Sequence, residues 1–155
     1  MKTIFLSFDK KWYPPLRDGK KKYEHRKRFC KQPIRAYLYI GKPIQSIVAE
    51  IGLGERESLE DWKSKYNNDA EVLERINDFS TRNRYAMKVL WFKEIVPIEL
   101  DDILERFPDF SVPRSYIVLD NKPSIKQWLD DTKRYTTNYY VNNSSDFNKN
   151  NICTY

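Results

Sequence analysis

The sequence predicts an α+β fold in which a small twisted or closed sheet carries helices on its outside. The chain has 155 residues, of which 40% are hydrophobic and 15% aromatic, so it is long enough to bury a core and too apolar to be mainly disordered. Segments with the two-residue period of strands alternate with segments of helical period, and several strands follow one another directly. This mixed order favours one sheet with helices packed around it.

The N-terminal elements begin with a strand over residues 3–8, which read TIFLSF. Pro14 and Pro15 then predict a helical turn, because proline suits the first turn of a helix. Residues 21–28 alternate in the manner of a strand, but side chains on both of its faces are polar. This strand is therefore not expected in the core, and one of its faces is expected to line a cleft.

A hairpin follows at residues 34–40 and 44–53, two hydrophobic strands joined by a Gly-Lys-Pro turn. Ser58 is expected to cap the next helix, with Asp61 three residues later at the capping-box position. A second helix is expected over residues 69–79, where apolar residues recur at helical spacing.

The second half of the chain begins with one long strand, or two, over residues 84–98. A short helix is expected over residues 100–106 and a short strand over 115–119. The last predicted helix covers residues 124–131, with Ser124 as its N-cap.

The composition changes from about Thr132 onward. Residues 135–155 contain six Asn, four Tyr and almost no aliphatic residues, too few apolar groups for a separate core. We therefore expect a folded domain over residues 1–131 and a C-terminal tail over residues 132–155. The tail is either mobile or an extended arm held by its tyrosines.

The positive charge of the chain is concentrated in residues 17–35, which read RDGKKKYEHRKRFCKQPIR. This run holds nine Lys or Arg residues and two acidic residues, a local net charge of +7, whereas the whole chain carries +6. A concentrated positive charge attracts polyanions, and phosphate backbones are the commonest of these. The alternative is a solvated strand and turn that happens to be rich in lysine.

Aromatic residues are interleaved with this run and precede it: Trp12, Tyr13, Tyr23 and Phe29. Single-stranded nucleic acids are held by bases stacked on such rings and by cations paired with phosphates. Tyr23 is the better stacking candidate because its strand neighbours are polar, whereas Trp12 is either core or a wall of the site. Ser7, at the end of the first strand, either donates a hydrogen bond to a ligand or caps the next turn.

Several other classes of protein are disfavoured. No apolar run approaches the ~20 residues of a membrane span, and the N-terminus reads as a strand rather than a signal peptide. Cys30 and Cys153 have no metal-ligand spacing, so free thiols in a reducing cytoplasm are expected. The single histidine, His25, supports neither a zinc site nor a catalytic triad. We expect a cytoplasmic protein with no metal, no cofactor and no membrane partner.

The segment TIFLSFDKKWYPPLRDGKKKYEHRKR resembles the opening of ASCH domains, a family of the PUA-like superfamily. The shared pattern is Gly-x-Lys-x-x-Glu-x-Arg, represented here by Gly19, Lys21, Glu24 and Arg26. A later YAMKV strand and a Pro-Arg-Ser segment at residues 113–115 follow in the family's order. The resemblance covers roughly residues 2–130 and leaves the tail without a counterpart.

This resemblance implies a small PUA-like β-barrel with helices at its openings and a cleft over one face. It also implies binding of RNA, or action on modified nucleosides. One ASCH branch resembles amidohydrolases that act on N4-acetylcytidine through a Lys, a Thr and a Glu. Lys21 matches the Lys, but Glu24 stands where the Thr is expected, which argues against that mechanism. The family's later Glu falls near Glu50 or Glu55.

The first functional hypothesis is an RNA- or nucleotide-binding protein with a basic cleft around residues 17–35. The residues expected to contact nucleic acid are Lys20, Lys21, Lys22, Tyr23, Arg26, Arg28, Trp12 and Ser7. An alternative is a hydrolase or ribonuclease on RNA or modified nucleosides, with Lys21 and Glu24 as catalytic residues. A third is a module that docks an acidic protein. Glu24 is expected to stay ionised with a lowered pKa, because Lys22, Arg26 and Arg28 crowd its strand.

Overall fold

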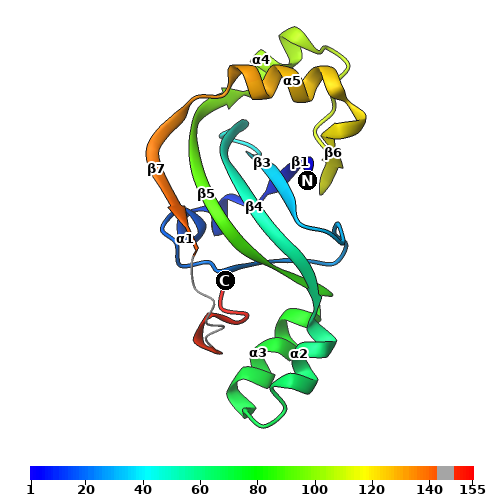
Figure 1. The fold of residues 1–155 in the computed structure, drawn as a ribbon, viewed down its shortest axis with the longest axis vertical. Helices are drawn as coiled ribbons and strands as arrows, with labels where there is room; N and C mark the ends of the chain where they lie inside the picture. Colours follow the sequence, from blue (N-terminus) through cyan, green and yellow to red (C-terminus); the bar gives the residue numbers. More distant parts are fainter. Residues whose placement is uncertain (143–148) are drawn as a thin grey trace.

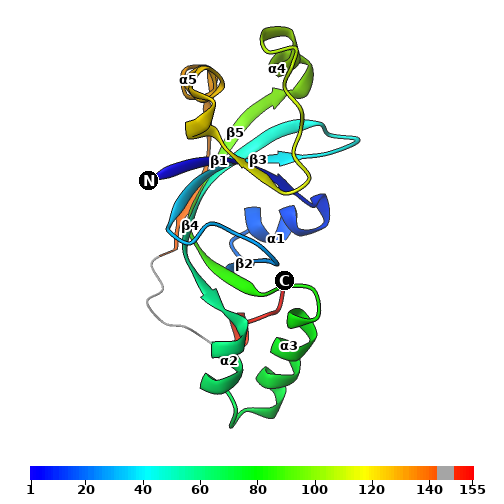
Figure 2. The ribbon, with the colours of Figure 1, turned by 90° about the vertical axis from the view of Figure 1, so that its right-hand side faces the viewer.

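The computed structural model describes residues 1–142 and 149–155. Within these residues, seven strands form one mixed sheet with the order β2-β5-β4-β3-β1-β6, and β7 pairs with β5 (Figure 1; β2 is labelled in Figure 2). The sheet curls into a half-barrel. Helices α4 and α5 cover one end of the molecule, and helices α2 and α3 lie at the other (Figure 1 and Figure 2).

The element order up to α5 agrees with the prediction, and most bounds differ by two residues or fewer. β4 ends five residues beyond its predicted end, and β7 is a strand within the predicted tail. The strands are β1 (Lys2–Phe8), β2 (Tyr23–Arg26), β3 (Ile34–Ile40), β4 (Ser46–Ser58), β5 (Tyr85–Glu99), β6 (Tyr116–Val118) and β7 (Tyr135–Val141). The helices are α1 (Tyr13–Arg17), α2 (Leu59–Lys65), α3 (Ala70–Ser80), α4 (Leu100–Arg106) and α5 (Pro123–Thr132). No helix in the described part of the chain is long and apolar enough to span a membrane.

The N-cap of α5 differs from the prediction. Lys122 is the N-cap and Pro123 opens the helix, so the assignment of Ser124 as the cap is wrong. The reason is that proline suits the first helical position, where its missing N–H is not needed. Ser58 does occupy the N-cap position of α2, but its side chain makes no capping hydrogen bond, so the predicted capping box is wrong.

The curl of the sheet comes from its two longest strands. β4 and β5 pair antiparallel over most of their length, and their register shifts between Ile47 and Ala49 and on both sides of Leu53. Such irregularities bend a strand and increase its twist. A Cβ at Gly52 would lie 2.4 Å from the indole nitrogen of Trp91, so glycine is required where that ring crosses β4. The bend places the α2–α3 pair close to β2.

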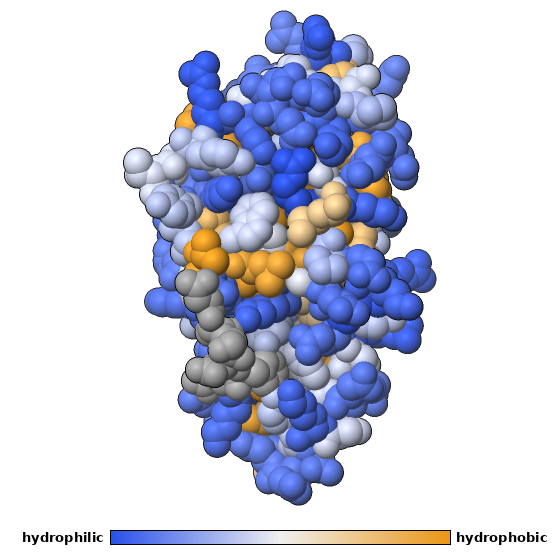
Figure 3. Space-filling model, viewed as in Figure 1, coloured by the Kyte–Doolittle hydropathy of each residue, from blue (hydrophilic) through white to orange (hydrophobic). Residues whose placement is uncertain are grey.

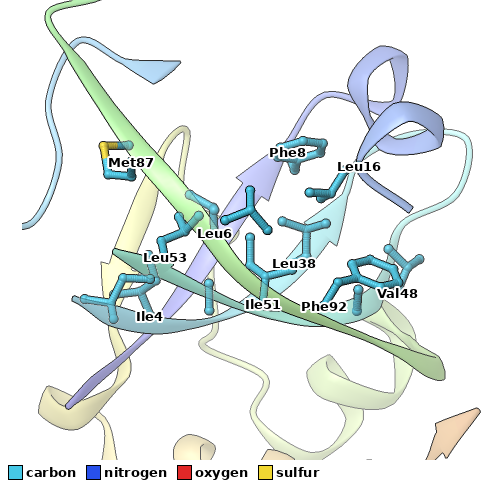
Figure 4. Close-up of a cluster of buried hydrophobic side chains, with 14 of the residues drawn as sticks. Ile4, Leu6, Phe8, Leu16, Leu38, Val48, Ile51, Leu53, Met87 and Phe92 are labelled. Atoms are coloured by element: carbon cyan, nitrogen blue, oxygen red, sulfur yellow. The ribbon is translucent and has the colours of Figure 1, made fainter. Parts of the chain in front are cut away.

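The hydrophobic core has three parts. The largest fills the concave side of the half-barrel and is drawn in Figure 4; its fully buried members include Ile4, Leu6, Leu38, Ile51 and Phe92. A second cluster packs α4 and α5 against the other side of the sheet. A third lies beneath α2 and α3 and includes Tyr23, Trp62, Ile76, Ile152 and Cys153.

Strand β2 is more buried than its sequence predicts. Tyr23, Glu24 and His25 are 6%, 6% and 9% exposed. The prediction of a strand outside the core is therefore wrong, because it assumed that polar side chains remain in water. Here Tyr23 packs edge-on against Trp62, and Glu24 is buried with charged partners.

The residues after α5 extend the sheet. β7 pairs antiparallel with β5 from Ile95 and Tyr135 to Trp91 and Val141, on the same edge of β5 that holds β2 further along. The Tyr140 hydroxyl donates a hydrogen bond to the Leu16 carbonyl at 2.6 Å. These contacts correspond to the extended-arm alternative. Figure 3 shows that this face is mainly polar, with apolar side chains near its middle.

Candidate ligand-binding cleft

A cleft of about 1040 Å³ opens between the end of β1, the turn before α1, strand β2, the C-terminal end of α3 and residues 112–114. Three acidic side chains line it: Asp9, Glu24 and Asp78. Seven Lys or Arg side chains line it as well: Lys10, Lys11, Lys21, Arg26, Lys42, Arg82 and Arg114. The net positive charge of this lining attracts anions, and the concave shape concentrates the potential.

The floor of the cleft is a buried charge cluster. Lys21 is 3% exposed, and its Nζ lies 3.4 Å from Oε1 of Glu24. The other carboxylate oxygen of Glu24 accepts hydrogen bonds from Arg26 Nε at 3.0 Å and Nη2 at 2.9 Å. Glu24 therefore pairs with a cation on each side, which is the arrangement that makes a buried carboxylate tolerable.

The charges shift the pKa values of this cluster in a consistent way. Burial alone would raise the pKa of Glu24, but Lys21 and Arg26 outweigh it and lower that pKa from 4.5 to about 2. Glu24 stays ionised, as the sequence predicts, although the cations responsible are Lys21 and Arg26 rather than Lys22 and Arg28. Burial lowers the pKa of Lys21, and the charge of Glu24 opposes this.

Arg26 also connects β2 to β1. Its Nη2 donates a hydrogen bond to the Ser7 carbonyl at 2.8 Å, and the Ser7 hydroxyl donates to the Pro113 carbonyl at 2.6 Å. Ser7 thus ties β1 to the loop that carries Arg114. Hydrogen bonds thus join β1, β2 and the loop around residue 113 on one side of the cleft.

Trp12 provides an aromatic wall. It is partly exposed and lines the cleft, and the Lys11 and Lys21 ammonium groups lie 4.7 Å and 5.8 Å from its ring centroid. An indole flanked by cations suits the binding of a planar base attached to a phosphate.

Crystal structures of ASCH from Zymomonas mobilis are similar to this fold. The first covers 86% of this chain and 96% of its own, with 22% identity and a TM-score of 0.65. The chain has an ASCH-like fold. A serine-to-alanine and a tyrosine-to-phenylalanine mutant of the same protein match with 20% and 21% identity and the same TM-score, and each covers 86% of this chain and 97% and 100% of its own. No protein-family model and no curated protein sequence matches the chain.

The cleft contains five of the residues that the sequence predicts for the site: Ser7, Trp12, Lys21, Glu24 and Arg26. The other four do not line it. Lys20 and Arg28 are exposed outside the cleft, and Lys22 lines a separate shallow depression beside β7. Tyr23 faces Trp62 in the third cluster and cannot stack on a ligand from there, because its face of the strand is covered by α2.

The cleft also contains cations that the sequence interpretation missed. Lys42 and Arg114 come from loops far from residues 17–35, and Arg82 follows α3. No local pattern marks them. The Lys10-Lys11 pair beside Trp12 is the exception, since basic residues next to an aromatic residue are a pattern visible in the sequence.

Neither Glu50 nor Glu55 lines the cleft. Glu50 is 2% exposed and pairs with Lys133 at 2.6 Å and with Arg35 at 3.7 Å, in contacts that fix the start of β7 to the sheet. Glu55 is exposed on β4. Among the described residues, no group of three or more His, Cys, Asp or Glu side chains is placed to hold a metal ion.

We expect the burial of His25 to make the stability of the fold depend on pH. The side chain packs edge-on against Phe79 at 4.7 Å, with Nε2 at 3.8 Å from the Cys153 sulfur. Burial, with Lys21 nearby, lowers the pKa of His25 from 6.5 to about 3. Below pH 6.5 the unfolded chain therefore binds a proton that the folded chain does not, so stability falls as pH falls.

We expect the free energy of unfolding to decrease by about 2 kcal/mol between pH 7 and pH 5, which corresponds to one proton taken up on unfolding. Urea unfolding at several pH values measures this. Since His25 is the only histidine, His25→Gln should remove most of the dependence in this range. An equal pH dependence in the variant would show that another group is responsible.

Proposed function

We propose that this protein binds RNA, or a nucleotide-like ligand, in this cleft. The observation that carries the proposal is the lining of the cleft, in which seven cationic side chains and the Trp12 ring surround a space of about 1040 Å³. Cations paired with phosphates and a ring stacked on a base are the two contacts that hold single-stranded nucleic acid. The resemblance to ASCH domains supports the same class of ligand.

Contacts to phosphates and contacts to a base are expected in different parts of the cleft. Lys10, Lys42 and Arg114 are exposed on its rim, and among the described residues none of them has an ion-pair partner. They are available to pair with phosphates. Lys21 and Arg26 lie deeper and are held by Glu24. A ligand would place its base near Trp12 and its backbone along the rim. The volume matches that of pockets for nucleotide-sized ligands, and a longer RNA would extend beyond the rim.

We expect Trp12→Ala to weaken the binding of a short single-stranded RNA by about 1–3 kcal/mol, since that is what stacking of one base contributes. Trp128→Ala is the matched control, because Trp128 is also partly buried but packs against Phe107 outside the cleft. Fluorescence anisotropy at two salt concentrations measures both. Equal affinity in wild type and Trp12→Ala would remove Trp12 from the site.

Incubation of wild type and Lys21→Ala with single-stranded RNA and with N4-acetylcytidine tests the hydrolase alternative. Lys21 and Glu24 are in contact in the cleft, as that alternative requires. However, an ionised Glu24 that is already paired with two cations is a poor general acid. We expect mass spectrometry to find RNA and N4-acetylcytidine unchanged. Robust turnover that is lost in Lys21→Ala would favour the hydrolase instead.

A further inference from the structure

Residues 149–155, called here the terminal segment, lie against α3 and end beside β2 (Figure 1 and Figure 2). Ile152 is fully buried and Cys153 is 2% exposed, both in the cluster beneath α2 and α3. Arg75 of α3 donates a hydrogen bond to the Lys149 carbonyl at 2.7 Å, and the Lys149 ammonium lies 3.4 Å from the Asp69 carboxylate. The segment is thus held by a small apolar anchor and by polar contacts.

Beyond this anchor, the terminal segment enters the cleft. Thr154 and Tyr155 line it, and the main-chain oxygen of Tyr155 accepts a hydrogen bond from Lys21 Nζ at 2.9 Å. Because Lys21 is only 3% exposed with the segment in place, an oxygen atom of a ligand cannot approach its ammonium group unless Tyr155 moves.

We propose that the terminal segment is an internal competitor for the cleft, with the Tyr155 main-chain oxygen occupying the position on Lys21 that a phosphate or carbonyl oxygen of RNA takes when it binds. This inference rests on the proposed function. The Lys21 ammonium group then has two alternative partners, the terminal segment and the ligand. The apparent affinity for RNA is then lowered by the fraction of molecules in which the segment is docked.

The docking contacts are of a kind that a ligand can displace. The apolar anchor consists of Ile152 and Cys153. In the Lys149–Asp69 pair the side chains are 64% and 32% exposed, so water screens the pair and its contribution to docking is small. Cys153 has a φ of 51°, in the left-handed region that residues other than glycine rarely adopt. This conformation disfavours the docked state relative to a released one.

The rate at which a reagent labels the Cys153 thiol measures release of the terminal segment. When docked, it is 2% exposed, and burial raises the pKa of its thiol to about 12, so it reacts slowly with a thiol reagent. In a Cys30→Ser background, Cys153 is the only remaining cysteine. We expect a saturating short single-stranded RNA to accelerate labelling of Cys153 roughly ten-fold, because bound RNA holds the segment away from the cleft.

Ile152→Asp should release the segment without RNA. Ile152 is fully buried in the docked state, and burial of a charged carboxylate in its place costs too much free energy. Cys153 labelling should then be fast at all RNA concentrations, and RNA should bind roughly ten-fold more tightly than to wild type. Val141→Asp is the matched control, since Val141 is 61% exposed and does not line the cleft. Circular dichroism verifies the fold of both variants.

The outcomes separate this inference from the proposed function. If RNA binds wild type but slows or does not change Cys153 labelling, the segment is a fixed wall and the inference is wrong. The inference is equally wrong if RNA binds a folded Ile152→Asp no more tightly than wild type. Should Ile152→Asp fail to fold, the labelling of the Cys30→Ser protein with and without RNA decides alone. If RNA binds neither protein, the proposed function itself fails.

Discussion

Glu24→Gln should lower the free energy of unfolding by about 3–5 kcal/mol, the usual cost of removing one partner from a buried ion pair. Glu24 is 6% exposed and supplies the only carboxylate in contact with Lys21 or Arg26 in the described part of the chain. The amide keeps the shape of the side chain but removes its charge. Lys21, at 3% exposure, is then left as a buried ammonium without a counter-ion.

The loss of stability in Glu24→Gln should become smaller as pH rises, and this direction would identify the unpaired Lys21 ammonium as its cause. Burial already lowers the pKa of Lys21, and removal of Glu24 lowers it further. A lysine with a lowered pKa in the folded state binds fewer protons folded than unfolded, so stability rises with pH. The deficit of Glu24→Gln relative to wild type should therefore shrink from pH 7 toward the ordinary lysine pKa of 10.5.

Urea unfolding of Glu24→Gln and of Glu60→Gln measures the effect. Glu60 is the matched control because its pair with Lys63 lies at the surface, with the Glu60 side chain 77% exposed. The control should change stability by less than about 1 kcal/mol. A Glu24→Gln protein as stable as the Glu60→Gln protein would contradict the assignment of Glu24 as the centre of the buried cluster.

The order of elements could be predicted because most strands carry their own pattern. Residues 34–40, for example, are almost entirely apolar and lie in the middle of the sheet as β3. The parallel pairing of β1 with β3 could not be predicted in the same way, since it depends on a crossover of more than twenty residues. The resemblance to ASCH domains supplied the small β-barrel that the pattern alone left open, and the observed sheet curls into a half-barrel.

The burial of β2 could not be predicted from the sequence for a different reason. Its polar residues are covered by side chains that are distant in sequence, Trp62 and Phe79 from the two helices and Cys153 from the terminal segment. A sequence pattern counts polar residues but cannot show which of them find partners. Glu24 and Arg26, two residues apart on one face of the strand, are partners that local spacing does suggest.

The basic run of residues 17–35 contributes only Lys21 and Arg26 to the cationic lining of the cleft. Lys20, Lys27 and Arg28 are exposed and lie outside the cleft, whereas Lys10, Lys42 and Arg114 line it from three separate parts of the chain. A cleft brings together residues from several loops, so its composition depends on the fold rather than on any single run. Each of these two sets contains three exposed cations, so a variant that lacks one set can be compared directly with a variant that lacks the other.

The second large effect expected is on RNA binding, when the three rim cations Lys10, Lys42 and Arg114 are all replaced by alanine. If each pairs with one phosphate of a single strand, the salt dependence of the affinity should fall by about 2 units, since each contact contributes about 0.7. The affinity at low salt should fall by more than ten-fold, because three phosphate contacts are lost together. Stability should change little because all three side chains are exposed.

The most direct test of ligand binding in the cleft is a comparison of this triple variant with one in which Lys20, Lys27 and Arg28 are replaced by alanine. Both variants lose three positive charges, so a long-range effect of net charge is equal in the two. Titration of a short single-stranded RNA at several salt concentrations gives the affinity and the salt slope of each. If RNA binds in the cleft, its affinity should fall strongly in the Lys10, Lys42 and Arg114 variant and only slightly in the other variant. The reverse result, with binding lost only when Lys20, Lys27 and Arg28 are removed, would contradict it.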